Sequence, residues 1–314
     1  MKQIHLIAPS GASLDVRKPL AGIEWLQQQG ITINNTACVS RVEQRFAGSD
    51  AERLAEINHL QHIPSDHLVM AMRGGYGIHR LLPNIEWDGI AKAVKSGLQI
   101  CGHSDLTVFQ LALLAKTEAM SLAGPMLNYD FGREDEQGNP MPPDIFMWKH
   151  FQKAVQERTL DCQVMAAQPY LGRVNSGSSS GMLWGGNLTV LAGLVGTAYI
   201  PSSKQTQGGI LFLEDVNEHP YRIERMLMQL LDAGILANQS AILLGGFSAY
   251  RLYDHDRGYR IESAIEAIRV RLSPEIPILL GLPFGHQVEK LTLPVGVTAN
   301  LHYGSQDFTL HSQW

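Results

Sequence analysis

The segment ICGHSDLT (100–107) places Ser104 directly after a short apolar run and directly before a helix-like pattern. A strand–turn–helix corner of this kind exposes a serine hydroxyl above the carboxyl edge of a parallel sheet, where the next backbone N–H, here that of Asp105, can bind an oxyanion. Gly102 fits the elbow pattern, whereas Leu106 stands where that pattern has a second glycine. Serine is also a preferred helix N-cap, so this segment alone leaves Ser104 as either a nucleophile or a cap.

A nucleophilic serine needs a base, and the base needs a partner that orients it. Among the twelve histidines, His286 follows an apolar strand in the Pro- and Gly-rich turn GLPFGH, which suits a side chain held at a sheet edge. Glu214 and Asp215 end the apolar run GILFLED, where a buried carboxylate is costly unless it is paired. An imidazole would pair it, although either carboxylate could instead cap the next helix and His286 could be an ordinary loop histidine.

A glycine-rich segment, MRGGYGIHRLL (72–82), follows another predicted strand. Adjacent glycines let backbone N–H groups face a ligand. The segment matches neither the phosphate-binding P-loop pattern nor the dinucleotide fingerprint. A second oxyanion donor therefore fits this segment better than a phosphate site does.

The sequence predicts no metal site and no disulfide framework. His59 and His62 have the spacing of a possible metal pair but no third ligand nearby, and Cys38, Cys101 and Cys162 lie far apart in the chain. Widely separated cysteines favour a reducing compartment.

Composition and charge argue against nucleic-acid-binding, membrane and secreted proteins. The formal net charge is −5 and the basic residues are scattered, so we expect no nucleic-acid or anionic-membrane surface. No apolar run approaches the ~20 residues that a membrane span needs, and the apolar stretch at the N-terminus is too short for a signal peptide. We therefore expect a cytoplasmic protein, and the length of 314 residues favours two domains.

The first 130 residues alternate short apolar runs with amphipathic segments, which predict strands and helices respectively. Strands joined by helices of this length form right-handed crossovers and a mostly parallel sheet, so we expect an α/β fold. The predicted strands are 3–8, 31–36, 67–72, 98–102 and 121–124, and the predicted helices are 15–30, 49–61 (capped by Ser49 or Asp50) and 105–119.

The second half mixes strands and helices, and its last 25 residues alternate with period two, as antiparallel strands do. The turn-rich stretch 128–144 and the segment NSGSSSG (175–181), which we expect to be flexible, flank one predicted helix at 145–158. We therefore predict an N-terminal α/β domain over 1–135, a connecting segment over 136–180 and a C-terminal domain over 181–314. The further predicted elements are strands 209–215 and 240–247 and helices 221–234 and 261–272.

Six blocks in this chain resemble the LD-carboxypeptidase family of serine peptidases in order and spacing, and the likeness runs nearly end to end. They are MRGGYGIHRLL, ICGHSDLT, LAGPML, LWGGNLTVL, LFLEDVNEHPYRIERML and GLPFGH. The resemblance is specifically to the members that act on murein tetrapeptides. It implies an N-terminal domain like the class I glutamine amidotransferases, a smaller β-rich swivelling C-terminal domain, a homodimer, and no metal or organic cofactor.

The resemblance also implies roles for single residues. Ser104 is then the nucleophile and forms a triad with Glu214 and His286, and the backbone N–H groups of Gly75 and Asp105 form the oxyanion hole. The implied reaction releases D-Ala from a murein tetrapeptide by cleaving its L,D-bond to meso-diaminopimelate during peptidoglycan recycling.

The sequence leaves the carboxylate site, the substrate and catalysis itself with alternatives. The carboxylate of D-Ala needs a cation or a cluster of N–H groups, and Arg73 beside the glycine loop is the candidate, unless it serves a structural salt bridge. Some relatives in this family cleave peptidyl-nucleotide antibiotics as self-immunity proteins, and the triad does not discriminate between the two substrates. A module that only binds a small ligand, with Ser104 as a cap, is the alternative that involves no catalysis.

Overall fold

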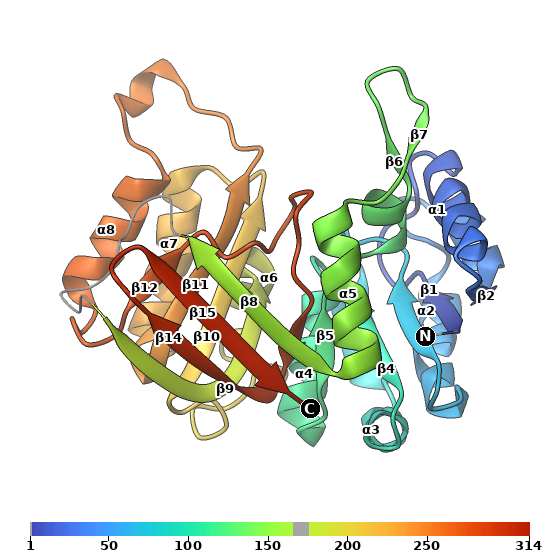
Figure 1. Cartoon of the computed structure of the whole chain (residues 1–314), viewed down its shortest axis with the longest axis horizontal. Helices are drawn as coiled ribbons and strands as arrows, with labels where there is room; N and C mark the ends of the chain where they lie inside the picture. Colours follow the sequence, from blue (N-terminus) through green and yellow to red (C-terminus); the bar gives the residue numbers. More distant parts are fainter. Residues whose placement is uncertain (1, 166–175) are drawn as a thin grey trace.

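Five parallel strands and one antiparallel edge strand form the sheet of the N-terminal half of the computed structural model, which describes residues 2–165 and 176–314 (Figure 1). The strand order is β13-β5-β4-β3-β1-β2, and only β13 runs antiparallel to its neighbour. The predicted parallel sheet is therefore confirmed. The strands are β1 (Gln3–Ile7), β2 (Thr32–Asn34), β3 (Leu68–Ala71), β4 (Gln99–Gly102), β5 (Ser121–Ala123) and β13 (Leu293–Val295).

Helices cover both faces of this sheet because its strands bury side chains on both sides. Ile4 and Leu6 of β1 pack in one core with α1 and α5, whereas Val69 and Ala71 of β3 pack in another core with α2, α3 and α4. Ser49 caps α2 in a reciprocal capping box, which decides between the two predicted caps. These helices are α1 (Arg17–Gln28), α2 (Asp50–Asn58), α3 (Trp87–Lys95), α4 (Leu106–Thr117) and α5 (Ile145–Glu157).

Short elements connect the strands and helices of this half. The paired strands β6 (Arg133–Glu134) and β7 (Pro140–Met141) form an arm that projects from the molecule (Figure 1). A π-helical turn over Leu127–Phe131 precedes this arm. The 3₁₀ turns span Thr36–Ser40, His59–His62, Ile78–Arg80 and Leu82–Asn84.

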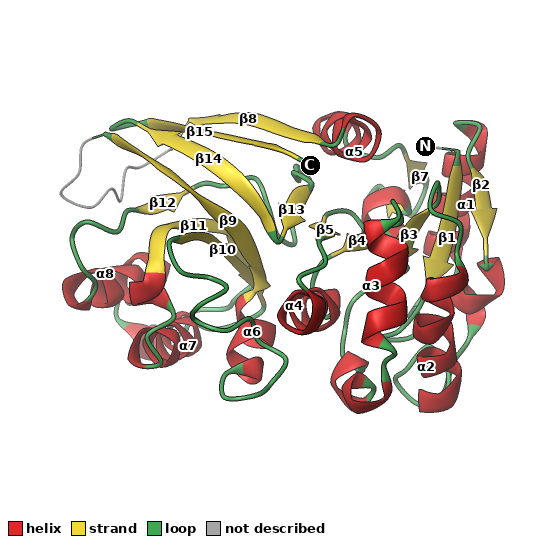
Figure 2. Ribbon diagram, turned by 90° about the horizontal axis from the view of Figure 1, so that it is seen from below, coloured by secondary structure: helices red, strands yellow, loops and turns green. Residues whose placement is uncertain are grey.

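A seven-stranded mixed sheet forms the C-terminal half, in the order β12-β11-β10-β9-β14-β15-β8. Strands β9 to β12 are parallel, and β14, β15 and β8 continue the sheet in antiparallel pairs, so the predicted antiparallel ending is confirmed. Helices α6, α7 and α8 lie on one face (Figure 2). The strands are β8 (Thr159–Met165), β9 (Gly177–Asn187), β10 (Gly209–Val216), β11 (Gln239–Ser248), β12 (Ile278–Leu280), β14 (Val297–Tyr303) and β15 (Asp307–Gln313). The helices are α6 (Leu188–Leu194), α7 (Pro220–Asp232) and α8 (Ile261–Arg271), with 3₁₀ turns at Leu236–Asn238 and Asp254–Asp256.

The flexibility expected for 175–181 is wrong for residues 177–181, which form the first half of β9. Their backbone pairs with β14, from Gly177 opposite Tyr303 to Gly181 opposite Ala299. Serine and glycine carry no apolar signal, so the strand there is set by its partner and not by local propensity. Asn175 lies outside the described residues.

Helix α4 begins two residues after Ser104 and is buried between the two halves of the molecule (Figure 2). It is apolar on all sides, as expected for a helix surrounded by protein. Strand β13 adds to the contact between the halves, because it leaves the C-terminal half to pair with β5. Residues on α4 and on the segment before β13 are therefore held where the two halves meet. Within the described residues, none of the helices combines the length and apolar character that crossing a bilayer requires.

Candidate active site

Ser104 occupies a sharp turn between β4 and α4, with a φ of 60°. This left-handed conformation is uncommon for a residue with a β-carbon and costs on the order of 1–3 kcal/mol. The surrounding turn must therefore enforce it. Ser104 lines a pocket at this turn.

The capping interpretation of Ser104 is wrong. Asp105 occupies the cap position of α4, and no side-chain hydrogen bond caps this helix. The backbone carbonyl of Ser104 accepts from Thr107 N, but its hydroxyl has no hydrogen bond among the described residues. The hydroxyl is thus free to react with a ligand in the pocket.

The glycine loop after β3 packs directly against this serine. A β-carbon added to Gly74 would lie 2.5 Å from Ser104 Oγ and 3.3 Å from Asp105 N, so only glycine fits there. Gly75 has a φ of 117°, which also favours glycine. Among the described residues, neither Gly75 N nor Asp105 N donates a hydrogen bond. Two unused N–H groups therefore flank the serine, as an oxyanion hole requires.

The Asp105 side chain holds the loops around the elbow together. Its Oδ2 accepts from Ser10 Oγ at 2.7 Å and from Ile78 N at 3.3 Å. Burial raises the pKa of Asp105, and these two hydrogen bonds oppose that rise. The carboxyl group thus fixes the loop after β1 and the loop after β3 beside Ser104.

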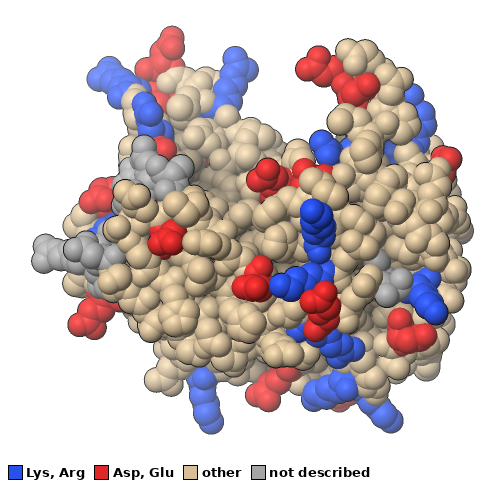
Figure 3. Space-filling view, in the orientation of Figure 1, with Lys and Arg blue, Asp and Glu red and all other residues tan. Residues whose placement is uncertain are grey.

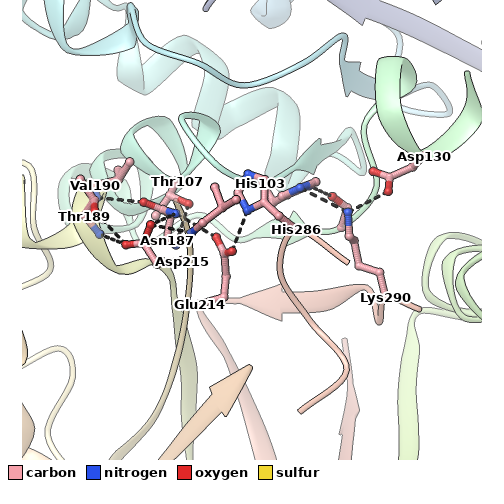
Figure 4. A network of polar contacts seen from close by, with 12 residues as sticks. His103, Thr107, Asp130, Asn187, Thr189, Val190, Glu214, Asp215, His286 and Lys290 are labelled. Carbon is pink, nitrogen blue, oxygen red and sulfur yellow. Dashed lines mark hydrogen bonds and ion pairs between the residues drawn. The ribbon is translucent and has the colours of Figure 1, made fainter. Parts of the chain in front are cut away.

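Glu214 and His286 meet at the end of β10. His286 Nδ1 lies 2.8 Å from Glu214 Oε2, and the Glu214 side chain is fully buried (Figure 4). A β-carbon on Gly285 would lie 3.0 Å from Glu214 Oε2, so the glycine before His286 permits this approach. The contact leaves the other imidazole nitrogen, Nε2, for the pocket.

The two acidic residues at the end of β10 share one donor, Asn187 Nδ2, which lies 3.3 Å from Asp215 Oδ1, and otherwise have different partners. Asn187 Nδ2 donates to Glu214 Oε1 at 3.1 Å, so both oxygens of Glu214 are engaged. Asp215 Oδ2 accepts from Thr189 N and Thr189 Oγ1, both at 2.8 Å, at the start of α6. Neither carboxylate caps the following helix α7, whose cap is His219.

A pocket of about 560 Å³ brings these residues together between the two halves. Ser104, Gly75 and Arg73 line it from the N-terminal half, and His286 lines it from the C-terminal half. Ser104 and His286 form no direct hydrogen bond in the described structure, a looseness that is common before substrate binds. Figure 3 shows the surface hollowed between the β6–β7 arm and the C-terminal half, with charges of both signs scattered over this face.

Arg73 lines the pocket, and among the described residues only one nitrogen of its guanidinium donates a hydrogen bond. Arg73 Nη1 donates to Ala12 O at 2.6 Å, and the guanidinium carbon lies 5.7 Å from the centre of the Tyr129 ring. Arg73 has no carboxylate partner among the described ion pairs, so the alternative of a structural salt bridge is not formed there.

Sequence reasoning missed four polar residues at this site. His103, Asp130 and Lys290 line the pocket, where Lys290 contacts the other two, and Asn187 donates to Glu214. His103 and Lys290 had a local signal, because each lies within four residues of a predicted site residue. Asp130 had none, since it falls in the turn-rich stretch. In the part of the chain described, no group of three or more His, Cys, Asp or Glu side chains could hold a metal ion.

Comparisons with known proteins relate both halves of the chain to one peptidase family. The family model for the LD-carboxypeptidase N-terminal domain matches residues 4–124, and the model for the LD-carboxypeptidase C-terminal domain matches residues 180–301. The crystal structure of a muramoyltetrapeptide carboxypeptidase from Oxalobacter formigenes is 39% identical and covers 100% of this chain and 99% of its own, with a TM-score of 0.86.

Two further relatives differ in the function that their names give. A probable murein peptide carboxypeptidase of Bacillus subtilis is 28% identical over 95% of this chain and 88% of its own length. The microcin C7 self-immunity protein of Escherichia coli is 27% identical over 93% of this chain and 88% of its own length.

Proposed function

The chain belongs to the LD-carboxypeptidase family and is a serine-type carboxypeptidase, and we propose that it releases D-Ala from murein tetrapeptides by cleaving their L,D-bond. The observation that carries the proposal is the 2.8 Å contact between His286 and Glu214 in the pocket where Ser104 stands at a strained elbow. The 39% identity to a muramoyltetrapeptide carboxypeptidase over the whole chain supports the choice of substrate.

The proposed chemistry begins with the tautomer of His286. Its Nδ1–H donates to Glu214, so Nε2 is the basic nitrogen and takes the proton of Ser104 Oγ. The Ser104 oxygen attacks the carbonyl carbon at the L-centre of diaminopimelate, and the oxyanion that forms accepts from the N–H groups of Gly75 and Asp105.

The tetrahedral intermediate then collapses to an ester on Ser104, and water hydrolyses that ester in a second stage. The C–N bond breaks, His286 Nε2 returns the proton to the leaving amine, and D-Ala departs from a Ser104 ester. A water molecule, deprotonated by His286, attacks that ester; the bond between the acyl carbon and Ser104 Oγ breaks, His286 returns the proton to Oγ, and the tripeptide leaves with a free carboxylate. No step needs a cofactor.

An exopeptidase must also recognise the terminal carboxylate. Arg73 is the candidate, because it lies one residue from Gly74 and keeps part of its guanidinium free of hydrogen bonds. A guanidinium binds a carboxylate with charge-assisted hydrogen bonds. We place the protein in the cytoplasm, in peptidoglycan recycling and in a homodimer on the basis of its resemblance to the family.

The second candidate function is self-immunity against a peptidyl-nucleotide antibiotic, which the 27% identity to the microcin C7 self-immunity protein favours. The two candidates differ in the group that is expelled when the Ser104 ester forms, which is D-Ala in one case and a nucleotide derivative in the other. Presenting purified protein with equal concentrations of a murein tetrapeptide and an aminoacyl-sulfamoyl nucleotide tests them together. We expect hydrolysis of the tetrapeptide to dominate, and preferential hydrolysis of the nucleotide would favour self-immunity.

A further inference from the structure

The loop between β12 and β13 carries two side chains that enter the space between the halves, His286 and, four residues later, Lys290. Lys290 is 2% exposed. Its ammonium donates to Asp130 Oδ1 at 2.8 Å, in the π-helical turn of the N-terminal half (Figure 4). The loop that carries His286 is thus anchored across the interface by a buried ion pair.

His103 is the third member of this cluster and has one possible tautomer. His103 Nδ1 lies 2.9 Å from the carbonyl oxygen of Gly124, so Nδ1 carries the proton and donates it. His103 Nε2 then accepts from Lys290 Nζ at 3.3 Å. Burial and the neighbouring Lys290 charge lower the pKa of His103 well below its usual value. The ring therefore stays neutral and fixed at both nitrogens.

The same ring contacts the proposed base. The rings of His103 and His286 meet edge to face, with their centres 5.0 Å apart and their planes at 71°. His103 also directly precedes Ser104 in the chain. The neutral His103 ring therefore belongs to the residue before the proposed nucleophile and packs against the proposed base.

We propose that His103, Lys290 and Asp130 form a positioning cluster that sets His286 at the correct place relative to Ser104. Lys290 anchors the loop through Asp130, and His103 provides the surface against which the imidazole rests. The inference rests on the proposed function, because it takes His286 as the base and Ser104 as the nucleophile. It assigns no bond-making role to the cluster. Asp130 balances the Lys290 charge, so the cluster presents no unpaired cation to a substrate anion.

Two variants test the cluster without leaving an uncompensated buried charge. The double variant Lys290→Met/Asp130→Asn removes both charges together, which a folded protein tolerates better than the loss of one. His103→Asn keeps a donor for Gly124 O and removes the ring beside His286. Arg41→Met is the control, because it breaks a partly buried ion pair with Glu56 outside the pocket.

The measurement is the rate at which a fluorophosphonate labels Ser104, alongside kcat and KM for murein tetrapeptide and the melting temperature. Labelling needs the nucleophile and its base but no particular peptide. A misplacement of about 1 Å can cost about 10²-fold in rate. We therefore expect the double variant to label about 10²-fold more slowly and His103→Asn about 10-fold more slowly, with KM within about twofold of the wild-type value.

The outcomes separate the positioning role from a structural role. Arg41→Met should melt earlier than the wild type and still label at the wild-type rate. A folded double variant or a folded His103→Asn that labels at the wild-type rate would overturn the positioning role and leave the triad standing. Failure of the wild type itself to label at Ser104 would overturn the proposed triad, and the positioning role with it.

Discussion

His286 Nδ1 and Glu214 Oε2 lie 2.8 Å apart although 72 residues separate them in the chain. Glu214 is fully buried, and Asn187 engages its other oxygen. A buried carboxylate held at both oxygens cannot rotate away, so it fixes the tautomer and direction of the imidazole. In the proposed triad, this contact lets the C-terminal half hold the base, His286, toward the serine of the N-terminal half.

Glu214→Gln tests that relationship directly. The amide keeps the shape of the side chain but can donate to His286 Nδ1 and so favour the wrong tautomer. Replacement of the orienting carboxylate by its amide in such a triad lowers kcat by about 10⁴-fold, and we expect a loss of that order. Steady-state kinetics on murein tetrapeptide would measure it. Glu266→Gln on the exposed side of α8 is the matched control, and equal losses in both variants would contradict the account.

Gly74→Ala tests the close approach of the glycine loop to the nucleophile. The new methyl group would lie 2.6 Å from Ser104 Cβ, so the serine or the loop must move. We expect kcat to fall by at least about 10²-fold. Gly193→Ala in α6 is the control, since its methyl group meets only His79 Nε2, at 3.9 Å, and alanine favours a helix. Full activity of Gly74→Ala would show that the loop does not confine Ser104.

The buried neutral His103 predicts a pH dependence of stability. Its pKa is lowered in the folded state, so the unfolded chain binds the extra proton as pH falls through 6.5. The free energy of unfolding should therefore decrease on acidification from pH 7 to pH 5, by up to about 1.4 kcal/mol per pH unit from this group. Urea titrations at several pH values would measure the slope. In His103→Asn the slope should be shallower by that amount, and an unchanged slope would mean that His103 is protonated in the fold.

Arg73→Met tests recognition of the terminal carboxylate. A hydrogen bond to a charged group contributes about 1.5–3 kcal/mol, so the variant should lose about 10- to 10²-fold in kcat/KM on the acid substrate. A tetrapeptide whose D-Ala is amidated lacks the negative charge and provides the comparison. The wild type should prefer the acid, and Arg73→Met should lose that preference. If Arg73→Met still prefers the acid, another residue binds the terminal carboxylate.

Local patterns in the sequence were enough to predict the five parallel strands of the first sheet and most helices, but not that β13 from the C-terminal half joins this sheet. Apolar runs bounded by turns located β1, β3 and β4, and the apolar stretch behind Ser104 located α4. The elbow and the glycine loop were also visible, because strand, glycine and serine follow one another within a few residues.

The sequence did not predict features that depend on contacts between residues far apart in the chain. The serine- and glycine-rich start of β9 is a strand because β14 pairs with it. The contacts of Lys290 with Asp130 and His103 span 160 and 187 residues, so no local pattern records them. Short-range periodicity predicts elements, whereas the cluster behind the site depends on how the two halves pack.

We propose that Ser104, activated by His286, cleaves the L,D-bond of a murein tetrapeptide. The most direct test incubates purified protein with murein tetrapeptide and follows D-Ala release by mass spectrometry, with Ser104→Ala in parallel. We expect the wild type to release D-Ala and the tripeptide and the variant to release neither. Release by a folded Ser104→Ala at the wild-type rate, or no release by either protein, would contradict the proposal.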